Sequence, residues 1–156
     1  MSIFDKNIEE IETTLRTRLM DLHKKYSEIF DINEDQLNTE YITTIYKSHS
    51  IRSEWLKAKM DATKLNRELQ KLYSKFYSQA KEGEVTVVRP DGKEVNRAFS
   101  GESEIREWIY TKEKYQKLKL WSDHQKILVE YYEKLLEAIQ MKTRILHNIQ
   151  VYDRVY

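Results

Sequence analysis

Basic residues recur at a helical spacing in the middle of the chain. Three lysines stand seven residues apart, and two further cations lie three or four residues from their neighbours: Lys57, Lys64, Arg67, Lys71 and Lys75. On an α-helix this spacing places the cations on one face, where they can hold the phosphates of a nucleic acid. A solvated helix face is the commoner meaning of the same spacing, and two acids interrupt the row.

Two aromatic residues accompany the cations. Tyr73 and Tyr77 follow on what the spacing suggests is an adjoining side of the helix. Flat rings next to cations suit a single strand, because unstacked bases can lie on the rings while the cations hold the backbone. The predicted interface for single-stranded DNA therefore comprises Lys57, Lys64, Arg67, Lys71, Tyr73, Lys75 and Tyr77.

Signals for catalysis are poor. The three glycines lie nine residues apart, which excludes a glycine-rich phosphate loop. The four histidines are isolated from one another, and no His-Glu-x-x-His helix could hold zinc. The chain has no cysteine, so it has no thiol nucleophile and no disulfide framework. We therefore expect neither an enzyme nor a bound metal or cofactor.

The residues that break regular structure gather in one window. Gly83, Pro90, Gly92 and Gly101 lie between residues 83 and 101, and neither type occurs elsewhere. Long helices are therefore predicted on both sides of the window. We expect a mainly all-α fold, a long helical hairpin or bundle with coiled-coil-like arms, with a small β-hairpin near residues 84–97.

The expected organisation is a single helical domain over residues 1–156. It divides into an acidic N-terminal helix in 1–36, a basic long helix in 37–82, a β-hairpin insertion in 83–101 and C-terminal helices in 102–156. The first helix is expected to begin near Asp5 and end near Phe30. The predicted N-caps of the later helices are Asn38 or Thr39, then Ser100 or Ser103, then Thr111.

The last helix carries two apolar stripes. One consists of Leu128, Tyr132, Leu135, Ile139 and Leu146, and the other of Tyr131, Ala138, Ile145 and Tyr152 at intervals of seven. Two stripes need two partners. One is the second helix of the same chain, and the other is most economically the same helix in another copy. The alternative is a single broad core face, but the regular heptad favours self-association.

Charge and hydropathy limit the kinds of partner that the protein can have. A formal net charge of +1 hides an asymmetry, because residues 1–40 carry ten acids against five bases and residues 57–82 carry seven bases against three acids. Two faces of opposite sign are expected. No apolar run approaches the length of a membrane span, so we expect no membrane partner.

Particular segments resemble the UvsY family of recombination mediators from T-even-type phages. They are Ser53-Glu54-Trp55-Leu56, Lys75-Phe76-Tyr77-Ser78, and the last helix from Ile127 through Lys142-Thr143-Arg144 to His147-Asn148-Ile149-Gln150. The family has Ser-Lys-Trp-Leu before a basic helix ending in Tyr-Tyr-Ser, and Lys-Ser-Arg with His-Ile-Gln-Asp at its close. Lys71 matches the first position of the family's basic pair, whereas Tyr73 replaces the second.

The resemblance implies a non-enzymatic mediator in the cytoplasm of a bacterial host. It implies a closed homo-oligomer that binds single-stranded DNA and helps a RecA-like (UvsX-like) recombinase displace the phage single-strand-binding protein. Two alternatives stay open: a prefoldin-like chaperone, which would need exposed apolar tips on its helices, and a coiled-coil scaffold without a nucleic-acid role.

Overall fold

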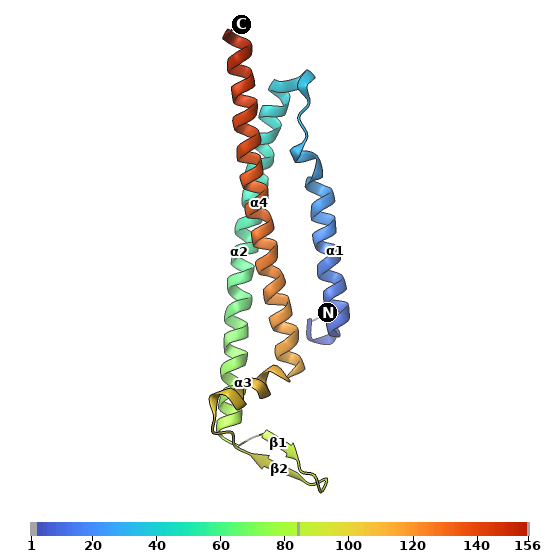
Figure 1. Ribbon diagram of the computed structural model, residues 1–156, viewed down its shortest axis with the longest axis vertical. Helices are drawn as coiled ribbons and strands as arrows, with labels where there is room; N and C mark the ends of the chain where they lie inside the picture. The colour runs from blue at the N-terminus through green and yellow to red at the C-terminus, as the bar shows by residue number, and fades with distance from the viewer. Residues whose placement is uncertain (1–2, 84, 156) are drawn as a thin grey trace. The chain divides into compact units, whose positions relative to one another are not determined.

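The computed structural model describes residues 3–83 and 85–155. Its α-helices and β-strands are α1 (Ile8–Tyr26), α2 (Leu37–Lys81), β1 (Val85–Val88), β2 (Glu94–Arg97), α3 (Glu102–Tyr110) and α4 (Glu113–Val155) (Figure 1). Short 3-10 turns occupy Ile3–Asp5, Ser27–Phe30 and Glu34–Gln36. The predicted fold class, mainly α-helical with one small β-hairpin, is confirmed.

Helix α1 begins with a capping box. The Asn7 side chain accepts a hydrogen bond from the Glu10 amide at 2.8 Å, and the Glu10 carboxylate accepts one from the Asn7 amide at 3.3 Å. This reciprocal pair satisfies amides that the first turn leaves unpaired. The helix therefore starts after Asn7, later than the predicted start near Asp5, and ends at Tyr26, where the chain tightens into a 3-10 turn.

The predicted cap of α2 at Asn38 or Thr39 is wrong, because both residues lie inside the helix. A 3-10 turn at Glu34–Gln36 leads directly into α2. Asn33 caps that turn, and its side chain accepts a hydrogen bond from the Asp35 amide at 3.1 Å. The polar residue that starts the helical run thus lies a turn earlier than the prediction placed it.

The predicted caps of the last two helices are also wrong. Gly101 occupies the N-cap of α3 without a side-chain hydrogen bond, so neither Ser100 nor Ser103 has this role. Thr111 closes α3, and its hydroxyl donates to the Trp108 carbonyl at 2.6 Å. Helix α4 starts two residues later, at Glu113.

The β-hairpin closes through a turn that requires glycine. The antiparallel register pairs Val85 with Arg97 and Val88 with Glu94. Beyond it, the Arg89 carbonyl accepts the Gly92 amide at 2.9 Å, and the Arg89 amide donates to the Lys93 carbonyl at 2.9 Å. Gly92 has φ +83°, the left-handed conformation that follows a type I turn in such hairpins.

The contacts divide the chain into two compact units. Unit 1 comprises Met1–Glu12 and Thr63–Asp123, and unit 2 comprises Thr13–Ala62 and His124–Tyr156. The core of unit 1 is formed by Ala80, Val85, Phe99, Ile105, Ile109 and Tyr115. The hairpin is anchored to this core, because Val85 and Phe99 are buried in it and the Phe99 amide donates to the Ala80 carbonyl at 2.9 Å.

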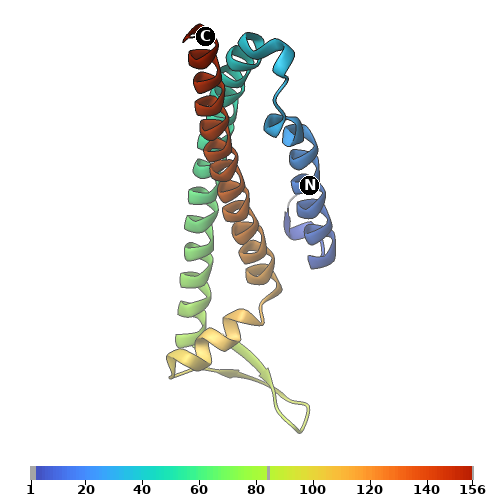
Figure 2. The same cartoon turned by 45° about the horizontal axis from the view of Figure 1, so that its top comes forward.

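Within unit 2, α2 and α4 run antiparallel (Figure 2). The contacts pair early α2 with late α4: Glu40 with Lys142 at 3.0 Å, Trp55 with Glu133 at 3.3 Å and the Ala58 carbonyl with Gln125 at 3.1 Å. The first predicted stripe of α4, from Leu128 to Leu146, is buried as expected. Tyr26, the last residue of α1, and Ile29 of the following 3-10 turn belong to the same core.

Candidate nucleic-acid interface

Four of the predicted cations are exposed on the part of α2 that belongs to unit 1. We call Lys64, Arg67, Lys71 and Lys75 the α2 ridge; all four are exposed. The apolar residues of the same segment, Leu65, Leu69, Leu72 and Phe76, are half-buried. The heptad-like alternation of the sequence thus separates an inward apolar face from an outward cationic face. Lys57 is exposed too, but it belongs to unit 2.

A cation from another helix lies beside the α2 ridge. Lys71, Lys75 and Lys114 of α4 line one hollow of about 320 Å³, together with Glu68 and an apolar wall of Phe4, Leu72 and Leu118. The Lys114 ammonium stands 5.0 Å from the centre of the Phe4 ring. The spacing within α2 gives no signal for Lys114, because only tertiary packing brings α4 against this face.

The two tyrosines do not lie with the α2 ridge. Tyr73 and Tyr77 are half-buried and stack on one another with ring centres 6.3 Å apart. Tyr73 also packs against Tyr115 at 6.0 Å. Two residues of an α-helix turn by about 200°, so Tyr73 points to the side of α2 opposite Lys75. The structure therefore does not bring the rings and the cations of this prediction together.

The tyrosines instead line a hollow of their own. It measures about 440 Å³ and includes Glu102 and Arg106 of α3 besides Tyr73 and Tyr77. The Lys81 ammonium lies 5.0 Å from the Tyr77 ring centre. Aromatic rings and cations therefore also lie together at this second hollow, on a different side of α2 from the ridge. A role of the two tyrosines in stacking bases stays a prediction, and it applies to this second hollow.

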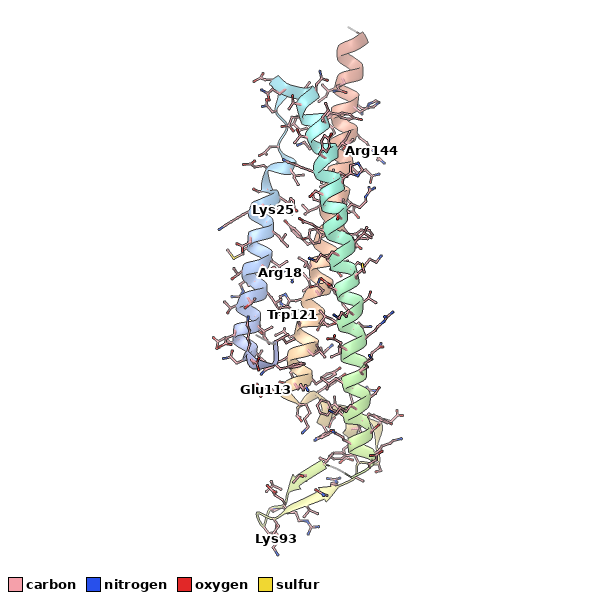
Figure 3. All side chains as sticks on the ribbon, turned by 180° about the vertical axis from the view of Figure 1, so that it is seen from behind. Arg18, Lys25, Lys93, Glu113, Trp121 and Arg144 are labelled. Atoms are coloured by element: carbon pink, nitrogen blue, oxygen red, sulfur yellow. The ribbon has the colours of Figure 1, made fainter. Side chains whose placement is uncertain are left out.

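The β-hairpin offers a further basic group in unit 1. Arg89 and Lys93 are exposed, and Lys93 projects from the tip of the hairpin (Figure 3). Arg97 is engaged elsewhere, since its guanidinium lies 2.7 Å from the Glu104 carboxylate. The tip therefore presents two cations, compared with the longer row on α2.

Unit 2 contains a larger hollow of mixed charge. It measures about 540 Å³, and residues of α2 and α4 line it together, among them Arg52, Arg144, Glu133 and Glu137. Figure 3 shows Arg144 on α4 next to the first half of α2. Two arginines and two glutamates line this hollow, so it has no excess of positive charge. The α2 ridge has four exposed cations beside Glu68, and an excess of cations is what binds a polyanion.

The predicted oligomerisation residues differ in exposure. Ile145 is 44% exposed, whereas Tyr131 and Ala138 are half-buried. Tyr131 packs against the core of unit 2, and this burial raises the pKa of its hydroxyl. Tyr152 lies on α4, but its side chain is outside the described part of the structure. The stripe therefore borders the core on one side and solvent on the other.

The described residues contain neither a cluster of metal ligands nor a helix that could span a membrane. No three or more acidic or histidine side chains come together as metal ligands would. None of the helices in the described ranges combines the length and the apolarity that crossing a membrane requires.

Comparison with known proteins identifies the fold. No family model and no curated protein matches the sequence. Among solved structures, the crystal structure of the bacteriophage T4 recombination mediator protein UvsY superimposes with a TM-score of 0.70 over 88% of this chain and 96% of that chain, at 16% identity. The resemblance read from the sequence is thus confirmed in three dimensions, and the chain has the fold of UvsY.

Proposed function

We propose that this protein is a non-enzymatic recombination mediator that binds single-stranded DNA through the α2 ridge and Lys114. The observation that supports this most directly is the row of exposed cations on one face of a chain with the UvsY fold. In this proposal the protein acts in the cytoplasm of a bacterial host. It promotes loading of a RecA-like recombinase onto DNA covered by the phage single-strand-binding protein.

A row of cations suits a strand better than a compact ligand. Successive members of the α2 ridge are three or four residues apart, which is a rise of about 4.5–6 Å along the helix. Each can contact a different phosphate of an extended backbone, and the contacts carry no sequence information. Lys114 widens the row at its Lys71–Lys75 end. Binding should therefore tolerate any sequence and weaken with salt.

Self-association is part of the proposal. One α2 ridge makes few phosphate contacts, so a single subunit holds DNA weakly. Several ridges on one closed homo-oligomer act on the same strand at a high effective concentration and multiply the affinity. The exposed side of the stripe at Tyr131, Ala138, Ile145 and Tyr152 is the proposed seam.

The first test is a fluorescence anisotropy titration of single-stranded and duplex DNA at two salt concentrations. The single strand should bind more tightly than the duplex, and its affinity should fall steeply with salt, because each neutralised phosphate releases about 0.7 of a counterion. Affinity that stays constant between the two salt concentrations would contradict the proposal and favour the chaperone or scaffold alternatives.

The second test replaces Lys64, Arg67, Lys71 and Lys75 together with Ala. Binding and the salt slope should both fall while helicity persists, since the side chains are exposed and Ala favours helix. The matched control replaces four exposed cations elsewhere, Arg16, Lys24, Lys47 and Lys126, and so removes the same charge. Equal losses in both variants would mean that net charge matters and the α2 ridge does not.

A further inference from the structure

The first half of α2 exposes large apolar side chains on its outer face. Met60 and Tyr46 are more than 70% exposed, and Ile42 and Leu56 more than half. Exposed polar residues continue the same line at steps of four and three, which gives the α2 stripe: Ile42, Tyr46, His49, Ser53, Leu56 and Met60. Large apolar side chains that stay exposed along one helix face mark an interaction surface.

Helix α4 carries a line with the same spacing. Ile127, Met141 and Ile145 are exposed, and three residues between them complete the α4 stripe: Ile127, Tyr131, Lys134, Ala138, Met141 and Ile145. The steps are again four, three, four, three and four, the pattern of a coiled-coil seam. Each stripe covers eighteen residue steps, or about 27 Å of helix, and both belong to unit 2.

The two stripes of one chain cannot pack on each other. Helix α2 buries Ile51 and Ala58 in the core that it shares with α4. Met60 follows Ile51 by nine residues, which is half a turn beyond two full turns, so Met60 points away from the core. Within the α2 stripe, His49 also borders the hollow that α2 and α4 line together. One copy thus presents two different seams, as a head-to-tail interface between copies requires.

We infer that the α2 stripe of one copy packs antiparallel on the α4 stripe of the next. With the stripes aligned over their whole length, four layers of the seam are apolar on both sides: Ile42 with Ile145, Tyr46 with Met141, Leu56 with Tyr131 and Met60 with Ile127. The two middle layers pair His49 with Ala138 and Ser53 with Lys134. The inference rests on the self-association in the proposed function and names the surface that receives the α4 seam.

The charges beside the stripes favour this pairing over two copies of α4. In the antiparallel register, Lys59 faces Glu130, and both side chains are exposed. Opposite charges at these flanking positions set partner and orientation in coiled coils. Two α4 helices would place Glu137 opposite Glu137 if antiparallel, or Lys134 opposite Lys134 if parallel.

A mixing experiment separates this arrangement from a symmetric one. Met60→Glu blocks only the α2 stripe and Ile145→Glu only the α4 stripe, so each variant alone should be a monomer by light scattering. Mixed in equal amounts they retain one intact seam between them. The mixture should therefore form a pair of about 38 kDa, twice the 18.9 kDa chain. Normal assembly of Met60→Glu, or a mixture that stays monomeric, would overturn the inference.

The register can be tested in the same protein because it has no cysteine. Met60→Cys with Ile127→Cys places thiols in one seam layer, so mild oxidation should link chains into a ladder. Met60→Cys with Ile145→Cys is the matched control, because these positions lie at opposite ends of the aligned stripes. Equal crosslinking of both double variants, or none in the first, would overturn the antiparallel register.

Controls for folding use exposed positions beside the stripes. Ser50→Glu on α2 and Gln140→Glu on α4 should assemble like the parent, and all variants should keep its helicity. Assembly is measured without DNA. A parent that assembles through these seams but binds no single strand would overturn the proposed function and leave this inference standing.

Discussion

A cluster of polar side chains near the core of unit 2 shows how single residues couple α1 to α2 and α4. The Glu54 carboxylate accepts hydrogen bonds from Lys25, at 3.0 Å, and from the Tyr26 hydroxyl. Burial alone would raise the pKa of Glu54, but the hydrogen bonds from Tyr26 and Lys25 outweigh it and leave that pKa lowered. Burial, and then the nearby charge of Glu54, raise the pKa of Tyr132 to about 12.

The raised pKa of Tyr132 predicts a loss of stability in alkali. The folded state favours the neutral hydroxyl of Tyr132. The stability that this neutral hydroxyl contributes is complete below pH 10 and is lost as the pH rises towards 12. Two pKa units correspond to about 2.7 kcal/mol as an upper figure. Tyr132→Phe cannot ionise, so its free energy of unfolding should fall less over this range. Urea titrations at pH 9 and pH 11.5 measure the difference, and equal losses in variant and parent would contradict the assignment.

At the scale of the elements, two glycines differ in whether their backbone conformation needs a glycine. Gly92 closes the hairpin at φ +83°, a conformation that disfavours any side chain. Gly101 caps α3 with φ −99° and ψ 137°, which any residue adopts. A Cβ atom at either position would meet no neighbour within 4 Å. Because no clash arises at either position, backbone conformation and helix capping decide how a substitution there changes the stability of the protein.

The same substitution should thus have opposite effects at these two glycines. Gly92→Ser should lower the free energy of unfolding by about 1 kcal/mol, since serine is strained at positive φ. Gly101→Ser should raise it by about 0.5–1 kcal/mol, because the hydroxyl can cap α3 and the unfolded chain loses freedom. Thermal unfolding of the two variants beside the parent measures both. Changes of the same sign would show that the turn and the cap are not the controlling features.

At the scale of the whole molecule, the proposed function links DNA binding to assembly. Ile145→Glu leaves the α2 ridge intact and removes only the α4 seam. Its affinity for a long single strand should fall at least tenfold, within the range that multivalency contributes. Its affinity for an oligonucleotide too short to reach two subunits should match that of the parent. A monomeric variant that binds the long strand as tightly as the parent would exclude avidity as the mechanism.

The sequence by itself determined the local elements of this protein. Helical periodicity and the gathering of glycine and proline between Gly83 and Gly101 predicted the long helices and the hairpin, and heptad spacing predicted the buried stripe from Leu128 to Leu146. These features depend on neighbours three or four residues away, which a sequence displays directly. The helix starts were less accessible, because a 3-10 turn or a bare glycine can begin a helix as well as a favoured cap residue.

Only the tertiary structure decided which faces are covered. Periodicity shows that Tyr73 and Lys75 lie on one helix, but packing against Tyr115 decides that the ring is half-buried. The tertiary structure also brings Lys114 to the α2 ridge and leaves the α2 stripe exposed. A helix face is a local property of the chain. Whether that face meets a core, a ligand or another copy depends on segments far away in sequence, and no local pattern specifies them.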